Sequence, residues 1–348
     1  MEVSPNGSAT VIRPLVGTIR VARGLTQKEV SSETEISQAV LSKVESGLME
    51  LDEERKLLLA RTLSVPVQAL DVAIDEGKSS GLVFHRKRAT LPVSKTNQIR
   101  AILDFTRVQV DALLGSGRQS PTLMRTPLPE DGLTTPEEVA QGLRKRLALA
   151  PGPLPDIVQV LEQAGMAVVR RDLGSTQIDA IVSWPEGDWP LVLLGNHAPG
   201  DRQRFTLAHE LGHAIMHQLP SEYQEQEADR FASEFLMPLQ DIRSELKEIS
   251  IPSLARLKSR WQVSMAALLR RARDIGTITE ARYKALIIEM SRAGYRKREP
   301  VDIIVAGPQQ IPEAIKRRLA LGETPSDLAE AAHLTLDEFD TLYGNEER

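Results

Sequence analysis

Hydrophobic residues recur at helical spacing in short runs throughout residues 11–75, and turn residues separate these runs. Thr26 stands three residues before Glu29, which is the pattern of a capping box and predicts a helix that begins at the next position. Ser37 is a candidate N-cap for another helix over residues 38–45, which a glycine ends. Two short helices joined by a tight turn predict an all-α helix-turn-helix unit in residues 11–75.

The pattern becomes irregular over residues 76–134, which predicts a linker with one connecting helix at residues 99–114. Glycine, serine and proline are frequent in the rest of this linker. Residues 82–100 contain five lysines and arginines and no acidic residue. This basic run can supply phosphate contacts, or it can be a solvated linker, which is the commoner role of charge runs.

A central α+β domain is expected at residues 135–245. Thr135 and Pro136 mark the start of a helix, because proline is favoured at the first helical position. Strands are expected at residues 166–170, 180–184 and 191–194, and further helices at residues 154–164, 202–218 and 223–235. We expect a small antiparallel sheet, in which residues 191–194 could bind an extended substrate if they form an edge strand.

Residues 246–348 are expected to be helical, with no strand. Apolar residues recur at helical spacing over residues 253–261, 264–273 and 280–292, and two or three small acidic helices follow residue 309. No repeat of fixed period is apparent. The whole pattern predicts a multidomain, mainly α protein.

Composition excludes several classes of protein. The 43 basic and 48 acidic residues give a net charge of −5, so the chain is not a global polycation for nucleic acid or membrane. The absence of cysteine excludes disulfides, thiolate zinc sites and cysteine nucleophiles, and it agrees with a reducing compartment. We find no signal-peptide pattern and no apolar run of membrane-spanning length. A cytoplasmic protein without membrane contact is expected.

The strongest chemical signal is the run His209-Glu210-Leu211-Gly212-His213, which lies within an uninterrupted helical pattern. Histidines four residues apart share one face of a helix, so both imidazoles can bind one metal ion. The glutamate between them can take a proton from water at the open coordination position of the metal. The run therefore predicts a catalytic metal site with Glu210 as general base.

Such a site needs a third protein ligand, and two acidic residues in the next predicted helix are suitable. Glu225 and Asp229 lie four residues apart on one face, so one can bind the metal and the other can accept a hydrogen bond from a ligating imidazole. Glu227 faces away from Asp229 and ranks below Glu225. Two histidines, one carboxylate and an open position describe a catalytic rather than a structural Zn²⁺.

Less specific interpretations of these residues exist. The two histidines could lie on an exposed amphipathic helix, or could be the relic of a lost site, and acidic pairs are common on solvated helices. The short spacing between the two motifs favours a metal site. His217 lies four residues after His213. In the metzincin pattern a third histidine ligand lies six residues after the second, so we interpret His217 as a packing or rim residue. His197 and Tyr223 are weaker candidates.

The predicted helix-turn-helix also has residues suited to DNA. Short polar side chains at the start of its second helix can meet base edges, and others can contact phosphates. The candidates for base contacts are Gln38, Ser42 and Lys43, and those for phosphate contacts are Gln27 and Ser37. Residues 10–75 carry eight basic and ten acidic residues, which is not the charge pattern of a DNA-binding domain, so a small helical interaction domain is the alternative.

Two resemblances follow from these motifs. The run from Leu25 to Gly47 resembles the Xre family of helix-turn-helix proteins, and RFTLAHELGHAIMH with EQEADRFASEFLMP resembles the ImmA/IrrE family of zinc metallopeptidases. The second resemblance implies a gluzincin-like fold, zinc held by His209, His213 and Glu225, and Glu210 as catalytic base. It also implies that Xre-type repressors are cleaved in stress responses. Asp229 stands where many relatives have asparagine.

The combined motifs indicate a DNA-binding regulatory zinc endopeptidase that cleaves a transcriptional repressor or a partner protein. The expected partners are a protein substrate of the Xre type and a double-stranded DNA operator, with a homodimer as a further expectation by analogy. The first alternative is an Xre-type regulator whose peptidase-like domain senses or scaffolds without turnover. The second is an antitoxin-like protein.

Overall fold

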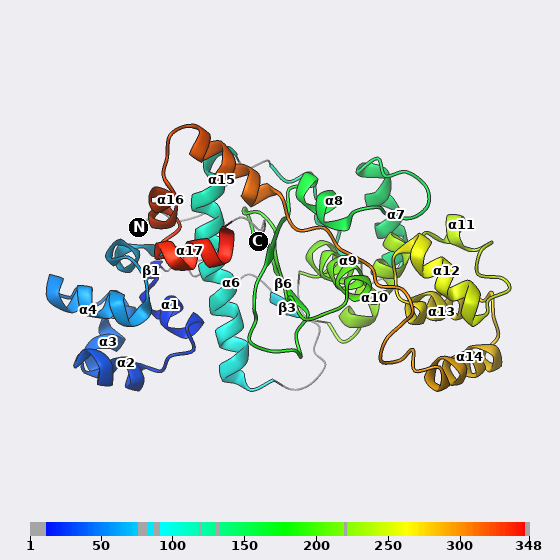
Figure 1. Ribbon diagram of the computed structural model, residues 1–348, viewed down its shortest axis with the longest axis horizontal. Coiled ribbons are helices and arrows are strands. Elements are labelled where there is room, and N and C mark those ends of the chain that lie inside the picture. Colours follow the sequence, from blue (N-terminus) through cyan, green and yellow to red (C-terminus); the bar gives the residue numbers. More distant parts are fainter. Residues whose placement is uncertain are drawn as a thin grey trace.

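The computed structural model describes residues 12–75, 83–85, 91–117, 120–129, 132–218 and 221–344. Figure 1 shows an elongated molecule with the N-terminal helices at one end, α11–α14 at the other end, and α6 and a small sheet between them. The multidomain, mainly α fold expected from the sequence is confirmed.

The N-terminal unit is a bundle of short helices closed by a two-stranded ribbon. Its elements are β1 (Ile12–Pro14), α1 (Val16–Ala22), α2 (Gln27–Thr34), α3 (Gln38–Glu45), α4 (Glu53–Leu63), η1 (Val67–Asp71) and β2 (Ala73–Asp75). Both predicted N-caps are confirmed, because Thr26 forms a capping box with Glu29 and the side chain of Ser37 accepts from the amide of Val40. Ile12, although at helical spacing, pairs with Asp75 in the β1–β2 ribbon.

The connecting helix of the sequence analysis is longer than expected and lies at the centre of the molecule. It is α6 (Val93–Leu114), which packs against α1 and α15 and is followed by the short turn η2 (Gly115–Gly117). Arg107 of α6 donates to the carbonyl oxygens of Trp189 at 2.9 Å and of Ser183 at 3.0 Å. The helix therefore joins the N-terminal unit to the loop and strand ends of the sheet.

The sheet is mixed, so the expectation of an antiparallel sheet is only partly met. It contains β3 (Val83–His85), β4 (Ala167–Arg170), β5 (Ala180–Ser183) and β6 (Leu191–Leu194) in the order β3-β5-β6-β4. β5 pairs antiparallel with β3 and β6, whereas β4 pairs parallel with β6. β6 is an interior strand with neighbours on both sides, so the condition for substrate pairing at residues 191–194, an edge strand, is not met.

A second group of helices, α7–α14, packs on the face of the sheet opposite to α6 and extends away from it. The elements are α7 (Pro136–Arg146), α8 (Ile157–Gln163), α9 (Gly200–Met216), α10 (Gln224–Leu236), α11 (Leu239–Ile242), α12 (Ile251–Trp261), α13 (Met265–Asp274) and α14 (Glu280–Arg292). Thr135 caps α7 in a capping box with Glu138, as the Thr-Pro start predicts. α9 packs against β5 and α10, and α10 also packs against α7.

The C-terminal segment leaves α14, runs back along the molecule and ends beside the N-terminal unit (Figure 1). It forms α15 (Gln310–Ala320), α16 (Pro325–Ala331) and α17 (Leu336–Tyr343). α15 and α16 pack against α6. Two or three small acidic helices were expected after residue 309, and three are present, but α15 is basic, with three cationic residues against Glu313. All three belong to the same part of the molecule as residues 12–75.

The sheet separates two hydrophobic cores, because alternate residues of a strand point to opposite faces. Val168 and Val192 belong to the core formed with α7–α10 and α12–α14. Val169 and Leu193, their neighbours in the chain, belong to the core formed with the N-terminal unit, α6 and the C-terminal helices. The candidate metal ligands lie on the side of the core that α7–α10 and α12–α14 form.

Candidate functional site

The two motif histidines lie on α9, which is buried along most of its length between the sheet and α10. His209 and His213 are one turn apart, and their exposed fractions are 1% and 0%. Burial on all sides holds the helix and the two imidazoles in place, which a metal site requires. Glu210, on the same helix, is also completely buried.

The predicted third ligand comes close to both histidines from the start of α10. The Nε2 atoms of His209 and His213 are 3.0 Å apart. The Glu225 carboxylate oxygens lie 3.5 Å from the first and 3.4 Å from the second. Atoms bound at about 2.0–2.1 Å to one tetrahedral zinc would be about 3.3 Å apart, so the three residues fit such an ion. Among the described residues, this is the one group of histidines and carboxylates with metal-binding geometry.

Gly212 allows α10 to approach α9 closely enough to bring in Glu225. A Cβ atom at this position would lie 3.0 Å from Cδ1 of Phe231, in the middle of α10. Phe231 is fully buried and stacks on Phe235, so it has little room to move. The glycine between the two histidines thus has a packing role at the contact between the two helices.

Each imidazole is oriented through its Nδ1 atom. Nδ1 of His209 lies 2.9 Å from the Asp229 carboxylate, in the role expected for Asp229. Nδ1 of His213 lies 2.9 Å from Nδ1 of His217, whose Nε2 in turn lies 3.0 Å from the Glu227 carboxylate. If each imidazole donates toward its carboxylate, Nε2 of both His209 and His213 keeps its lone pair for a metal.

His217 and Glu227 therefore have positions that the sequence interpretation missed. The sequence indicates a packing or rim residue at position 217 and a Glu227 that faces away from Asp229 and ranks below Glu225. α9 ends at Met216, and the extended backbone of His217 turns its ring back toward His213. The four-residue spacing between His213 and His217 was the available signal, since it indicates a shared face whether or not His217 is a ligand.

The predicted DNA-contacting side chains share one region of the N-terminal unit. Ser37, Gln38, Ser42 and Lys43 are exposed on α3 or at its N-cap. Gln27 is half-buried and donates to Glu45 at 2.9 Å, and Arg20 forms an ion pair with the same carboxylate. This contact fixes the start of α2 against the end of α3.

A groove of about 330 Å³ lies beside these residues, between the N-terminal unit and α6. Gln27 and Ser42 line it together with the basic side chains of Arg13 and Arg100. Arg100 belongs to the predicted basic run, whereas Arg86, Lys87 and Arg88 of that run lie outside the described residues.

Comparison with known families agrees with both parts of this description. Residues 161–273 match the IrrE N-terminal-like domain, and residues 17–70 match a helix-turn-helix family. The chain joins an Xre-type helix-turn-helix to an ImmA/IrrE-type domain. No curated protein matches the chain. The IrrE-like match runs from α8 to α13 and includes His209, His213, Glu225 and Asp229.

Burial and hydrogen bonds within the IrrE-like domain shift the pKa values of the histidines and of Glu225. Burial disfavours a charged His209, but hydrogen bonds with Asp229 and Glu225 outweigh it and raise the His209 pKa to about 9. Burial lowers the pKa of His213, and burial together with His213 lowers the His217 pKa to about 4. Burial alone would raise the Glu225 pKa, but hydrogen bonds with the two imidazoles lower it overall. Glu225 is therefore ionised at neutral pH, as a ligand must be.

The IrrE-like site opens on the side of α10. The side chain of Glu225 is 49% exposed, although the two imidazoles that it faces are buried. Asp229 is further held by Arg270 of α13, whose Nη1 lies 3.5 Å from its carboxylate. Of the weaker candidates, His197 contacts the Asp179 carboxylate at 2.9 Å, and Tyr223 is the 63% exposed N-cap residue of α10. None of the described helices is both long and apolar enough to span a bilayer.

Proposed function

We propose that the chain is a DNA-binding regulatory zinc endopeptidase that cleaves a transcriptional repressor of the Xre type. The observation that carries this proposal is the convergence of His209, His213 and Glu225 at distances suited to one tetrahedral zinc ion. Two histidines and one partly exposed carboxylate leave a position for water, which a purely structural zinc site would fill with a fourth protein ligand.

Zinc held by these three residues would supply Lewis-acid chemistry, activating a water molecule and polarising a peptide carbonyl. Glu210 would serve as the general base and acid, accepting a proton from water at the site and later donating it to the leaving amine. Its complete burial beside His209 places this carboxylate next to the candidate metal ligands and away from bulk solvent. Asp229 on one imidazole, and His217 with Glu227 on the other, keep both rings in the ligating orientation.

The N-terminal unit would bring this activity to DNA. Gln38, Ser42 and Lys43 are exposed at α3, where they can reach base edges, and Ser37 and Gln27 are placed for phosphate contacts. Arg100, which lies outside the helix-turn-helix, would add positive charge beside Arg13 in the adjacent groove. A dimer that reads two half-sites is our expectation by analogy with other helix-turn-helix regulators.

The test is a cleavage assay with the full-length protein. The purified chain is incubated with and without zinc together with Xre-type repressors encoded in the same genome, and the products are separated on a gel. We expect zinc-dependent shortening of one repressor. The Glu210→Gln variant should retain zinc and lose cleavage by a factor of at least about 100, as expected when a general base is removed.

Two results would contradict the proposal in different ways. A chain that binds no zinc under conditions where it is folded would reject the metal site itself. A chain that binds zinc but cleaves no repressor would support a sensing or scaffolding domain without turnover. Cleavage that is equally fast with glutamate or glutamine at position 210 would reject Glu210 as the general base.

A further inference from the structure

The three C-terminal helices repeat the plan of α1–α3 at a constant separation of 298 residues (324 minus 26). α1 ends at Ala22 and α15 at Ala320, and α3 spans Gln38–Glu45 where α17 spans Leu336–Tyr343. All three boundaries are related by the same separation. The match extends beyond the helix ends to the residues that shape the turns.

The turn residues have the same roles in the two units. Thr26 and Thr324 are N-caps that form capping boxes, with Glu29 and Asp327 respectively. Each box is preceded by a glycine with positive φ, Gly24 at 74° and Gly322 at 99°. The amide that follows each glycine bonds back to the first helix in the same way, from Leu25 to Arg20 at 3.1 Å and from Glu323 to Arg318 at 3.2 Å.

The turn between the second and third helices also recurs. Glu35 and His333 both have a left-handed backbone with φ of 57°, which is uncommon for residues other than glycine. Ser37 and Thr335 then cap α3 and α17 through the amide three residues later. The same positions are buried in both units: Val30 and Leu328, Ile36 and Leu334, and Leu41 and Phe339. Local geometry and core positions together identify a second helix-turn-helix.

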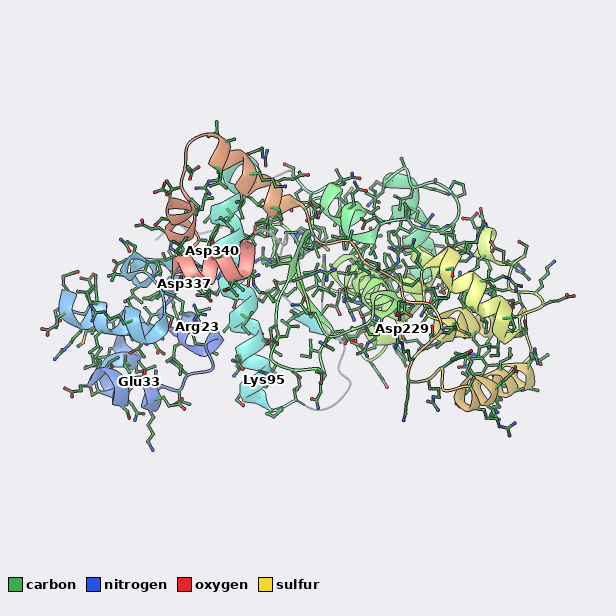
Figure 2. The ribbon with its side chains drawn as sticks, in the orientation of Figure 1. Arg23, Glu33, Lys95, Asp229, Asp337 and Asp340 are labelled. Carbon is green, nitrogen blue, oxygen red and sulfur yellow. The ribbon has the colours of Figure 1, made fainter. Side chains whose placement is uncertain are left out.

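The residues proposed to contact DNA are not retained in the second unit. Gln27, Ser37, Gln38, Ser42 and Lys43 correspond to Pro325, Thr335, Leu336, Asp340 and Thr341. α17 carries Asp337, Glu338 and Asp340 and no basic residue, so its surface would repel phosphates. Figure 2 shows Asp337 and Asp340 on α17, in the half of the molecule that holds the N-terminal unit.

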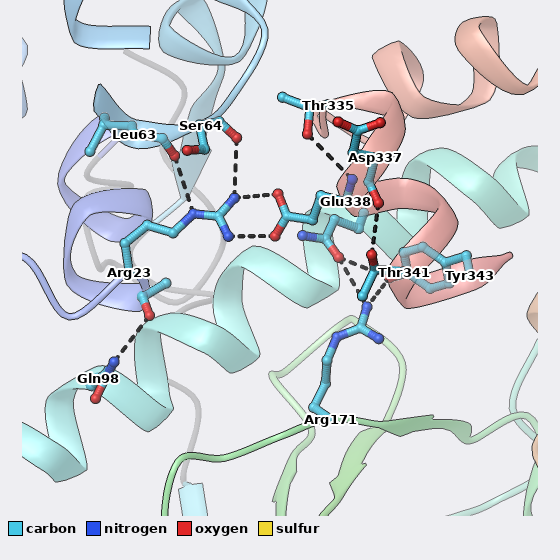
Figure 3. A network of polar contacts seen from close by, with 12 residues as sticks. Arg23, Leu63, Ser64, Gln98, Arg171, Thr335, Asp337, Glu338, Thr341 and Tyr343 are labelled. Carbon is cyan, nitrogen blue, oxygen red and sulfur yellow. Dashed lines mark hydrogen bonds and ion pairs between the residues drawn. The ribbon is translucent and has the colours of Figure 1, made fainter. Parts of the chain in front are cut away.

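α17 instead contacts protein at both of its ends (Figure 3). At one end, the Glu338 carboxylate pairs with both terminal nitrogens of Arg23, which also donates to the carbonyl oxygen of Leu63 at 3.2 Å. At the other end, the hydroxyl of Tyr343 accepts from Arg171, next to β4, and donates to Gln109 of α6 at 2.8 Å. α17 thus connects the first helix-turn-helix to α6 and to the edge of the sheet.

We propose that residues 310–344 are a second helix-turn-helix unit that does not bind DNA and whose partner is the first unit of the same chain. The second unit holds the DNA-reading unit in one orientation relative to the IrrE-like domain. α6 supports it by packing against α15 and α16, and Arg318 of α15 donates to the carbonyl oxygen of Ala112 at 2.8 Å. The assignment does not depend on peptidase activity.

A reciprocal exchange of residues tests the DNA part of this proposal. The double variant Ser42→Asp with Lys43→Thr copies α17 into α3, and Asp340→Ser with Thr341→Lys copies α3 into α17. Binding of a short duplex of random sequence at low salt is measured by fluorescence anisotropy for both full-length variants. We expect the first variant to lose affinity at least about tenfold and the second to stay within about twofold of the unchanged chain. A gain in affinity of about tenfold or more when α17 is altered would place α17 at the DNA and overturn the assignment.

Charge reversal tests the contact between the two units. Arg23→Glu and Glu338→Arg each place like charges opposite one another, and the double variant restores the pair in the reverse direction. Hydrogen exchange of the α1 and α17 amides should be faster by about fivefold or more in each single variant and near the original rate in the double variant. Circular dichroism confirms that each variant is folded. Single variants that exchange at the original rate, or a double variant as fast as the singles, would refute the contact.

Discussion

Replacement of His217 by phenylalanine tests whether the His217–Glu227 pair supports the proposed metal site. Phenylalanine keeps an aromatic ring in a position that is only 8% exposed, but removes the nitrogen 2.9 Å from Nδ1 of His213. It also removes the partner of Glu227. The direct contacts of His209 and Glu225 are untouched, so any change in metal binding comes from the orientation of His213.

The expected loss follows from the role of outer partners at metal sites. Loss of an outer partner of a metal-bound histidine weakens affinity about 10- to 100-fold, or about 1.4–2.7 kcal/mol. The buried N–H of His213 left without an acceptor would in addition lower the stability of the protein by about 1–3 kcal/mol. We therefore expect zinc affinity of His217→Phe to fall by about one to two orders of magnitude.

Competition with a chromophoric zinc chelator measures this affinity in the folded protein. Glu227→Gln is the matched control, because its amide oxygen can still accept from His217 while the negative charge is lost. Its effect should be smaller, and adding it to His217→Phe should cause little further loss, because both act through one chain of contacts. Zinc affinity of His217→Phe within about twofold of the original would refute the reasoning.

Two further predictions concern packing and buried charge. Gly212→Ala should lower stability by about 1–3 kcal/mol and weaken zinc binding, because its Cβ would lie 3.0 Å from Phe231. Gly142→Ala, in α7 with no atom within 4 Å of the new Cβ, should instead raise stability by about 0.5–1 kcal/mol; equal effects in thermal unfolding would argue against a special contact at Gly212. Glu234→Ala leaves the buried cation of Arg271 without its partner and should cost about 3–5 kcal/mol in a urea titration, whereas a cost below about 1 kcal/mol would show that water replaces the carboxylate.

Local signals explain most of what the sequence predicted correctly. Capping boxes at Thr26 and Thr135 depend on residues three positions apart, so the helices that they begin are recognisable without tertiary information. The same holds for His209 and His213, whose spacing alone places them on one helix face. The prediction that Glu225 of α10 is the third ligand required a contact between two helices. Glu225 lies close to His209 and His213 because the connection between α9 and α10 is short.

The sequence could not reveal the second helix-turn-helix as a repeat. Val30 and Leu328, or Leu41 and Phe339, share burial but not identity, and only N-caps and turn geometry recur. A search for repeated residues therefore misses a repeat of backbone conformation. For α17 the sequence indicated only a small acidic helix, because its contacts with Arg23 and Arg171 join residues far apart in the chain.

By itself, the amino-acid order determined most of the helices, their capped starts and the pair of histidines, because each depends on side chains within one or two helical turns. Only the tertiary structure decided that β4 runs parallel to β6, that α6 is a central helix and that His217 turns back toward His213. These outcomes depend on which apolar faces, far apart in the sequence, pack against each other and are buried from water. Many pairings of apolar faces are compatible with one pattern, and close packing in three dimensions selects among them.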